Sequence, residues 1–280
     1  MNHESALSLL HRKGLTGRRV GVGHLDTGVD ATHPAVSGSI AGFCYFDEDG
    51  SPLPERQPCD TGEHGTQTAG LICRVAPEAG LYSGAVIEGG KEVVRILAGM
   101  EWLLRHDIRV VCISLGVPGY TPVFASAIEQ FRKRGILPVA PVGNSGVGGS
   151  RSPGNYPGVL SVGAVDENGS VAPFSGSQRF RRADDVQKPN LVAPGCQVAV
   201  DRKGDAGVPV CGTSMAAAYV AGIAALLFEA RPEASIVEME NALSAGCSLP
   251  DPAFIHRYGK GIVDPLASWE VLCGSRPSPG

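Results

Sequence analysis

Four polar side chains in this 280-residue sequence could together cleave an amide bond. A serine hydroxyl such as that of Ser214 attacks a carbonyl carbon only when a neighbouring base accepts its proton, and the imidazole of His64 is suited to that task. A buried carboxylate such as that of Asp26 would fix the tautomer of the imidazole and stabilise its charged form. The carboxamide of Asn144 would donate a hydrogen bond to the negative charge that develops on the attacked oxygen. These residue types predict nucleophilic acyl transfer.

The spacing of the four residues means that only a tertiary fold can bring them together. His64 follows Asp26 by 38 positions, and Ser214 follows His64 by 150. Taken singly, each has a plainer interpretation. An Asp-Thr-Gly after a strand or an asparagine before Ser-Gly is usually a turn, a histidine beside glycine is usually a loop residue, and a serine at a helix start is usually an N-cap. Their occurrence together in one chain favours the interpretation that they form a catalytic site for acyl transfer.

The elements that must position these residues follow from the hydrophobic pattern. Continuous apolar runs predict strands, and segments with apolar residues on one face predict helices between them. The predicted strands are 19–25, 40–46, 81–87, 108–115, 136–142 and 159–165, and the predicted helices are 64–73, 91–106, 123–134, 213–230 and 235–245. Strands buried on both faces that alternate with helices indicate an α/β fold, with a mostly parallel central sheet and helices on both faces.

Ligands of such a sheet bind outside the carboxyl ends of its strands. Asp26 ends the first predicted strand, Asn144 follows a later strand, and His64 and Ser214 open helices, so all four are expected at one edge of the sheet. Free N–H groups at the helix start would also favour negative charge beside Ser214. We divide the chain into a lead-in of residues 1–18, one domain of residues 19–273 and a flexible tail of residues 274–280, because no linker or internal repeat interrupts the middle.

Composition excludes several other classes of function. The chain has 24 Lys and Arg against 28 Asp and Glu, a net charge of −4, so it offers no basic surface for nucleic acid or an anionic membrane. Its longest uncharged stretch leaves only 216–228 as a continuous apolar helix, which is too short to span a bilayer and is expected to be buried. No N-terminal segment matches a signal peptide, which predicts a cytoplasmic protein.

The eight cysteines do not form a metal or redox motif, because no two of them are closer than 14 positions. Cys112, Cys196 and Cys211 lie in apolar stretches, where a free thiol packs as a small hydrophobic group. Cys44 and Cys59 could form a disulfide bond. Without a signal peptide, however, we favour a reducing compartment and free thiols.

Five sequence blocks in a fixed order resemble the subtilisin-like serine proteases, or subtilases. The blocks are VGHLDTGVD at 22–30, HGT at 64–66, SLG at 114–116, GNSG at 143–146 and GTSMA at 212–216. The resemblance implies a single-domain three-layer sandwich, a catalytic triad of Asp26, His64 and Ser214, and Asn144 as the oxyanion donor. It also implies a substrate site in which an extended peptide pairs with the main chain of a strand end, formed by Ser114, Leu115, Gly116 and Gly143.

The same resemblance places Arg151 or Ser152 near the base of the primary specificity pocket. An Arg151 that points inward would favour an acidic or polar side chain just before the scissile bond. An Arg151 that points to solvent, the orientation we favour, would leave a broad apolar preference.

Three departures from the family pattern bear on activity and cofactors. Gln67 stands where the family has a second histidine, and Ala218-Tyr219 stands where it has Pro-His, but neither change removes a triad atom. The chain runs from 71–74 directly into 75–77, where many relatives insert a calcium loop, so we expect no calcium there and no other cofactor. Only 25 residues precede Asp26, so we expect either a member that folds without a propeptide or a processed form.

The sequence therefore predicts a serine endopeptidase that forms an acyl-enzyme on Ser214. A more specific hypothesis is that the enzyme is dedicated to processing a precursor. The alternative is a catalytically silent subtilase-fold domain that binds peptides. Competent side chains at all four reactive positions favour the enzyme. Its expected partner is a peptide or protein in extended conformation, without nucleic acid or membrane, and the sequence leaves the oligomeric state open.

Overall fold

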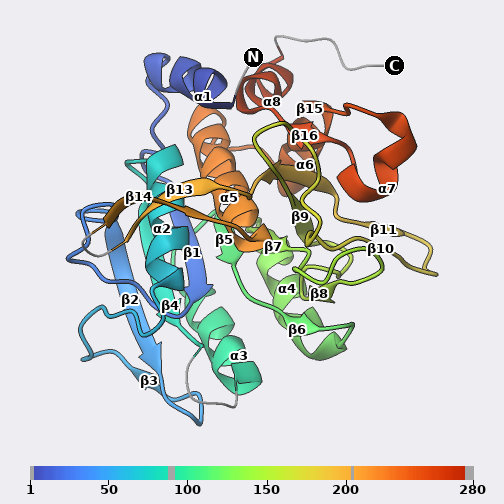
Figure 1. The fold of residues 1–280 in the computed structure, drawn as a ribbon. Helices are drawn as coiled ribbons and strands as arrows, with labels where there is room; N and C mark the ends of the chain where they lie inside the picture. Colours follow the sequence, from blue (N-terminus) through green and yellow to red (C-terminus); the bar gives the residue numbers. More distant parts are fainter. Residues whose placement is uncertain (1–2, 88–91, 203–204, 275–280) are drawn as a thin grey trace.

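A computed structural model describes residues 3–87, 92–202 and 205–274 of the chain. At its centre lies a ten-stranded sheet (Figure 1). In spatial order its strands are β15 (Cys247–Ser248), β16 (Ile262–Val263), β12 (Leu191–Pro194), β9 (Leu160–Val165), β7 (Leu137–Pro141), β5 (Val110–Ile113), β1 (Gly21–Asp26), β4 (Gly80–Ala85), β2 (Ile40–Phe46) and β3 (Pro52–Leu53). The strands from β16 to β2 run parallel, and the edge strands β15 and β3 are antiparallel to their neighbours.

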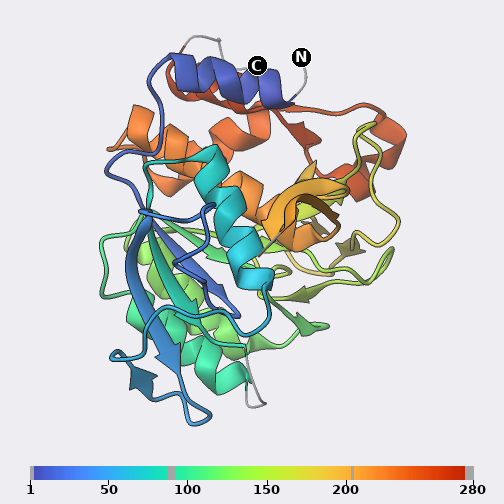
Figure 2. The ribbon, with the colours of Figure 1, turned by 60° about the vertical axis from the view of Figure 1, so that its left-hand side comes forward.

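Helices cover both faces of the sheet and make a three-layer molecule (Figures 1 and 2). One face carries α1 (His3–Arg12), α2 (His64–Val75), α5 (Thr213–Ala230), α6 (Ile236–Ala245) and α8 (Pro265–Leu272), whose apolar residues share one core. The opposite face carries α3 (Glu92–Leu103) and α4 (Ala125–Lys133), which contribute to a second core. The predicted α/β fold with a mostly parallel sheet between helical layers is confirmed.

The remaining elements are short strand pairs and short helices outside the central sheet. The two-stranded pairs are β6 (Val117–Pro118) with β8 (Arg151–Ser152), β10 (Gln178–Arg179) with β11 (Gln187–Lys188), and β13 (Val198–Arg202) with β14 (Asp205–Val210). The short helices are η1 (Pro122–Phe124), η2 (Pro252–Phe254) and α7 (Ile255–Tyr258).

Side chains of β1 enter both cores, because successive side chains of a strand point to opposite faces of the sheet. Val22 joins the core beneath α2 and α5, and Leu25 joins the core beneath α3 and α4. The same alternation places His24 and Asp26 on the α2 side with Val22. The α2 side of β1 thus carries polar side chains at the end of an otherwise apolar strand.

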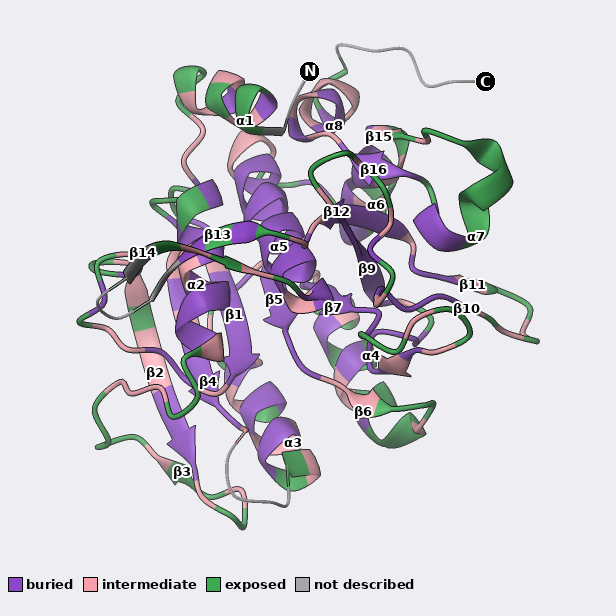
Figure 3. Ribbon diagram, viewed as in Figure 1, coloured by how far each residue is buried: buried purple, intermediate pink, exposed green. Residues whose placement is uncertain are grey.

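Helix α5 runs through the first core and is buried along most of its length (Figure 3). It is long and apolar enough to cross a membrane by length and composition, yet 83% of its residues are buried inside the protein. A helix that is apolar on all sides is stable when other elements surround it. The prediction that this segment is a buried core helix is confirmed.

The element boundaries differ from the sequence predictions mainly at their ends. The predictions at 40–46 and 213–230 match β2 and α5. The helix predicted at 123–134 begins instead with the single 3₁₀ turn η1, where Pro122 stands at the first position. The helix predicted at 91–106 ends at Leu103, and position 91 lies outside the described residues.

The lead-in of residues 1–18 contains a packed helix. Within α1, Ala6 and Leu10 are fully buried four positions apart, and His11 hydrogen-bonds the carbonyl oxygen of Val75 across 2.9 Å. The ammonium of Lys13 lies 4.4 Å from the ring centre of Trp269 in α8. The lead-in is therefore attached to the body of the domain. The tail predicted at 274–280 lies outside the described residues except for Gly274.

All eight cysteines are free in the structure, so Cys44 and Cys59 form no disulfide. Cys112 is fully buried in β5, as expected of a small hydrophobic group. Cys211, in contrast, is exposed, and its sulfur lies 2.9 Å from that of Cys196. Its predicted burial is wrong because β13 and β14 form a separate hairpin outside the central sheet.

Candidate active site

The predicted reactive residues meet at one edge of the sheet. Asp26 is the last residue of β1, Ser114 directly follows β5, and Asn144 lies shortly after β7. These strands are parallel neighbours, so their carboxyl ends share an edge. A cleft of about 520 Å³ opens there. Its lining includes Ser114, Leu115, Gly116, Gly143, Asn144, Arg151 and Ser214.

Asp26 and His64 form a direct pair. The Nδ1 of His64 lies 2.7 Å from Asp26 Oδ1 and 3.0 Å from Oδ2, so the ring donates its Nδ1 proton to the carboxylate. The carboxylate is fully buried, whereas 38% of the His64 side chain is exposed. With Nδ1 bonded to Asp26, the lone pair of Nε2 is available to accept a proton.

Asp60 joins the end of β1 to the start of α2. One of its oxygens accepts the Thr27 hydroxyl at 2.6 Å, and the other accepts the main-chain N–H and hydroxyl of Thr66, both at 2.6 Å. The Thr27 hydroxyl in turn accepts the N–H of Gly65. These bonds fix His64 relative to Asp26. Sequence reasoning missed Asp60, although the Asp-Thr-Gly at 60–62, just before His64, repeats the one at 26–28.

The charges of the pair shift both pKa values. Burial alone would raise the pKa of the Asp26 carboxyl, but the charge of His64, the nearby imidazole of His24 and the hydrogen bond from His64 hold it well below its usual range. The charge of Asp26 raises the pKa of His64 above the ordinary 6.5, against the opposing effect of burial, and Asp60 adds to the rise. Asp26 is therefore an anion whenever His64 titrates.

We expect kcat/KM to rise with pH through a midpoint above 6.5, the ordinary pKa of the His64 imidazole. Only the unprotonated ring can accept a proton, and a raised pKa means that this form appears at higher pH. Rates on a chromogenic peptide between about pH 5 and pH 9 would check this. In the Asp60→Asn variant, which lacks one of the charges that raise this pKa, the midpoint should move to lower pH. A flat profile would contradict the prediction.

Ser214 lies in the first turn of α5, beside the end of β5. Its hydroxyl donates a long hydrogen bond of 3.4 Å to the carbonyl oxygen of Ser114. Within the described parts of the chain, no hydrogen bond joins this hydroxyl to His64. Catalytic hydrogen bonds are often long or misaligned without substrate and tighten when it binds. Rotation of a small serine side chain is enough to redirect its hydroxyl.

Asn144 has an orientation fixed by Thr213. The carboxamide oxygen of Asn144 accepts the main-chain N–H of Thr213 at 3.0 Å and its hydroxyl at 2.8 Å. Because both partners are donors here, the other atom of the amide must be its NH₂ group. A Cβ built on Gly212 would lie 3.8 Å from both that Nδ2 and the N–H nitrogen of Ser214. The nitrogens of two donors therefore lie near one point, and an oxyanion site needs donors placed in this way.

Arg151 points into the cleft. Its Nη1 donates to the carbonyl oxygen of Gly116 at 3.0 Å. A Cβ on Gly143 would lie 2.8 Å from Arg151 Cγ, and one on Gly116 would lie 2.8 Å from Arg151 Cβ, so the two glycines leave the space that the side chain fills. The solvent-facing orientation that we favoured from the sequence is wrong. The physical reason is this pair of missing side chains.

The guanidinium of Arg151 has an N–H donor that no acceptor in the described part of the structure pairs with. Its Nε is buried and has no hydrogen-bond partner. Among the residues that the structure describes, no carboxylate pairs with it. A cation that no described carboxylate contacts thus lines the same cleft as Ser214, and the lining also includes the exposed Glu92.

Ser152 does not line the cleft, although the sequence placed either Arg151 or Ser152 at the base of the pocket. Its side chain is fully buried, and its hydroxyl bonds the carbonyl oxygen of Gly119, the N–H of Thr121 and the side chain of Asn155. Successive residues of β8 point to opposite sides, so only one of the two can face the cleft. Ser152 instead fixes the loop after β6.

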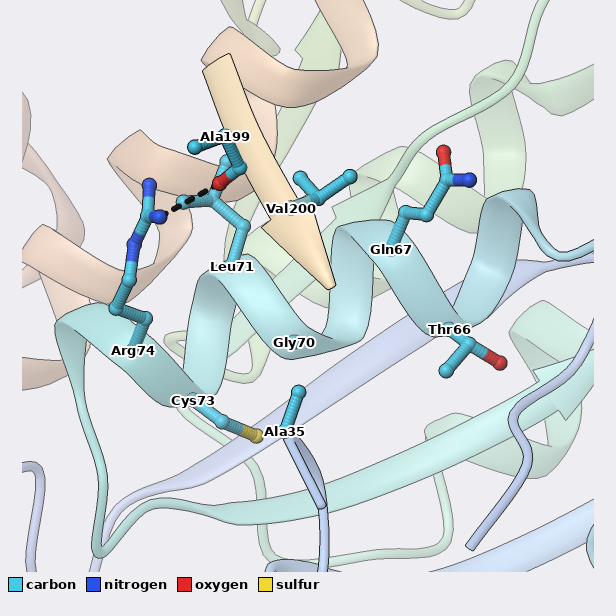
Figure 4. A pocket seen from close by; sticks show the side chains of 9 residues that line it. All are labelled: Ala35, Thr66, Gln67, Gly70, Leu71, Cys73, Arg74, Ala199 and Val200. Carbon is cyan, nitrogen blue, oxygen red and sulfur yellow. Dashed lines mark hydrogen bonds between the residues drawn. The ribbon is translucent and has the colours of Figure 1, made fainter. Parts of the chain in front are cut away.

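A second hollow, of about 230 Å³, lies between α2 and β13 (Figure 4). Its one charged side chain, Arg74, donates to the carbonyl oxygen of Ala199 at 2.6 Å, the dashed line in the figure. Gln67, which replaces the second histidine of the family motif, lines this hollow and not the cleft. The replacement therefore does not alter the lining of the cleft.

The segment after α2 does not fit a calcium ion. Its carboxylate, Glu78, is already held by the hydroxyl of Thr16 and the guanidinium of Arg18, each at 2.7 Å. Ala76 and Pro77 offer only main-chain oxygens, and a calcium ion needs six to eight oxygen ligands. Throughout the described residues, no group of three or more His, Cys, Asp or Glu side chains could hold a metal.

A parallel α/β sheet with an Asp–His pair, a serine at a helix start and two converging donors at one edge defines a serine protease. The chain belongs to the Subtilase family, whose family model matches residues 17–261. It is a serine-type endopeptidase. Relatives support the same assignment. Subtilisin Savinase of Lederbergia lenta is 35% identical over 270 residues, which cover 92% of this chain and 93% of that protein.

Two further comparisons bear on length and fold. M-protease of Shouchella clausii (strain KSM-K16) is also 35% identical over 270 residues, and the match spans 92% of this chain and 66% of that relative. The solved structure of the prenylagaramide maturation protease PagA superposes with a TM-score of 0.79 at 23% identity, covering 96% of this chain and 98% of that one. At this identity the likeness shows the shared fold.

Proposed function

We propose that Ser214 is the nucleophile of this endopeptidase, His64 its general base and acid, and Asp26 the carboxylate that orients His64. The observation that carries the proposal is the Asp26–His64 pair at the same edge of the sheet as a serine whose main-chain nitrogen and the Nδ2 of Asn144 lie near one point. A bound peptide in extended conformation would pair with the main chain at Ser114–Gly116. Its N–H would then compete for the Ser114 carbonyl oxygen and release the Ser214 hydroxyl toward His64.

The reaction proceeds in two halves. His64 Nε2 accepts the Ser214 proton while Oγ attacks the peptide carbonyl, and Asn144 and the Ser214 N–H stabilise the oxyanion. The imidazolium then protonates the leaving amine, and an acyl-enzyme remains. In the second half, His64 accepts a proton from water, the resulting hydroxide attacks the ester, and the proton returns to Ser214.

We further propose that the enzyme cleaves after acidic residues. The support is the position of Arg151, whose guanidinium lines the cleft together with Ser214 and is paired with no carboxylate of the described residues. Arginine pairs with a carboxylate through charge-assisted hydrogen bonds, which are about twice as strong as neutral ones. Glutamate or aspartate just before the scissile bond would supply that carboxylate.

Cleavage of an unbiased peptide library tests this specificity. Wild type should cut after Glu or Asp at least about tenfold faster than after Phe, since a hydrogen bond to a charged group contributes at least this factor. Arg151→Met keeps most of the side-chain length but lacks the charge, and it should prefer apolar residues. Arg105→Ala, which removes an exposed arginine far from the cleft, is the matched control. Equal cleavage after Phe and Glu by wild type and Arg151→Met would end the acidic hypothesis.

A restricted cleavage preference fits an enzyme that processes a precursor at few sites. PagA, which shares this fold, is described as a maturation protease. We propose the same kind of role for this chain, with a substrate that carries an acidic residue at its cleavage site. Broad degradation of unfolded proteins by wild type, at many residue types, would contradict it.

A further inference from the structure

Three polar side chains lie buried next to Asp26, and none of them lines the cleft. His24, Thr68 and Ser83 are all fully buried. His24 Nδ1 lies 3.0 Å from the hydroxyl oxygen of Ser83, and His24 Nε2 lies 2.9 Å from that of Thr68. The Thr68 hydroxyl lies 2.9 Å from Asp26 Oδ2. A continuous path of hydrogen bonds therefore leads from Ser83 through His24 and Thr68 to Asp26.

Strand pairing and helix position bring these residues together. His24 and Asp26 are two positions apart in β1 and so share a face of the sheet. The register of β1 with β4 sets His24 directly opposite Ser83. Thr68 follows His64 by one helical turn in α2, so it lies on the same helix face. Of His24, Thr68 and Ser83, only His24 lies in one of the subtilase-like sequence blocks, the one at 22–30, and no role was predicted for it from the sequence.

The number of hydrogens fixes the direction of the path. A carboxylate can only accept, so Thr68 donates its single hydroxyl hydrogen to Asp26. The carbonyl oxygens of His64 and Gly65 lie farther from the Thr68 hydroxyl, at 3.2 and 3.1 Å, and are neutral acceptors. His24 Nε2–H must then donate to Thr68, and in the neutral imidazole Nδ1 accepts the hydroxyl hydrogen of Ser83. Every member of the path is satisfied in this arrangement.

We propose that Thr68 and His24 are positioning residues for catalysis, which hold Asp26 Oδ2 so that Oδ1 faces His64 and which disperse the charge of the carboxylate. Asp26 Oδ1 also accepts the N–H of Thr27 at 2.7 Å. Each oxygen of the fully buried carboxylate thereby has a donor that holds it in place. His24 acts through Thr68, because its Nε2 lies 3.7 Å from Asp26 Oδ2, beyond hydrogen-bond range.

The other groups that face Asp26 do not replace this path. They are His64 from α2 and the thiol of Cys112 from β5, while the charge of Asp60 acts on His64. Burial raises the pKa of Cys112 to about 12, so this thiol stays uncharged. The inference rests on the proposed role of Asp26 as the triad carboxylate.

Paired substitutions at Thr68 test the proposal. Thr68→Val has nearly the same shape but no hydroxyl, and we expect kcat to fall about tenfold with KM unchanged, the factor typical of one lost hydrogen bond to a charged group. Thr68→Ser keeps the hydroxyl and should restore most of kcat. The pH midpoint of kcat/KM should move to higher pH in Thr68→Val, because without that donor Asp26 attracts the His64 proton more strongly.

A double-mutant cycle separates positioning from packing. His24→Leu should lower kcat in the wild-type background but have no further effect in Thr68→Val, because His24 acts through the hydroxyl that this variant lacks. His24→Gln, which can place an amide N–H near the position of Nε2, should retain more activity than His24→Leu. Ser161→Ala is the control, since it removes a buried hydroxyl that has no hydrogen-bond partner.

Three outcomes would overturn the proposal: a wild-type kcat and pH midpoint in folded Thr68→Val, additive losses in the double variant, or equal activity of His24→Gln and His24→Leu. If Thr68→Val does not fold, the His24 pair decides the question. Failure of the positioning proposal can be distinguished from failure of the proposed function. Loss of activity in Ser214→Ala with normal activity in these variants would reject the positioning role alone, whereas an active Ser214→Ala would reject the triad.

Discussion

Replacement of Ser214 by alanine is expected to abolish peptide cleavage, with kcat about 10⁶-fold below wild type, the size known for the same replacement in subtilisin, a member of this family. Without Oγ there is no nucleophile and no acyl-enzyme. The rate that remains would come from the oxyanion donors and substrate binding alone. The fold should be unaffected, because the side chain makes one long hydrogen bond in the structure.

A fluorophosphonate probe measures this prediction without knowledge of the substrate. Such a probe labels an activated serine, so wild type should be labelled and Ser214→Ala should not. Ser248→Ala, an exposed serine of the edge strand β15, serves as the matched control and should label like wild type. Labelling of Ser214→Ala would assign the nucleophile elsewhere. Absence of labelling in folded wild type would favour the silent peptide-binding alternative.

The second large effect is expected for Asp26→Asn, with kcat about 10⁴-fold below wild type and little change in KM, the loss found when a triad aspartate is replaced by asparagine in a serine protease. The asparagine nitrogen would present a donor where His64 Nδ1–H needs an acceptor. His64 would then favour the opposite tautomer, with its hydrogen on Nε2, and could no longer accept the Ser214 proton. The charge that stabilises the imidazolium would be lost as well.

Steady-state kinetics on a peptide with glutamate before the scissile bond would measure this effect. Asp251→Asn is the matched control, because Asp251 caps the short helix η2, and asparagine caps helices equally well. A loss of less than about tenfold in Asp26→Asn would show that His64 does not depend on this carboxylate for its tautomer.

The sequence could predict much of the fold because strand and helix patterns in this chain are local. The predictions at 40–46 and 213–230 match β2 and α5, and α5 is buried on nearly all sides, which needs apolar residues at nearly every position. The helix at 123–134 was less well predicted, because Pro122 favours a different first turn. The helix in the lead-in packs against α8 and bonds Val75 of α2, and no local signal foretells such contacts.

The sequence by itself determined which residues could react. Asp26, His64, Asn144 and Ser214 each stand in a short block whose residue types are rare in combination, and the alternation of strands and helices already implied one shared edge of a sheet. What only the tertiary structure decided is how distant segments meet there. Arg151 faces the cleft because Gly116, 35 positions away, has no side chain to exclude it. His24 reaches Asp26 through Thr68 because the register of β1 with β4 and the position of α2 bury these groups together. Such contacts depend on strand register and helix packing, which residues far apart in the sequence set jointly.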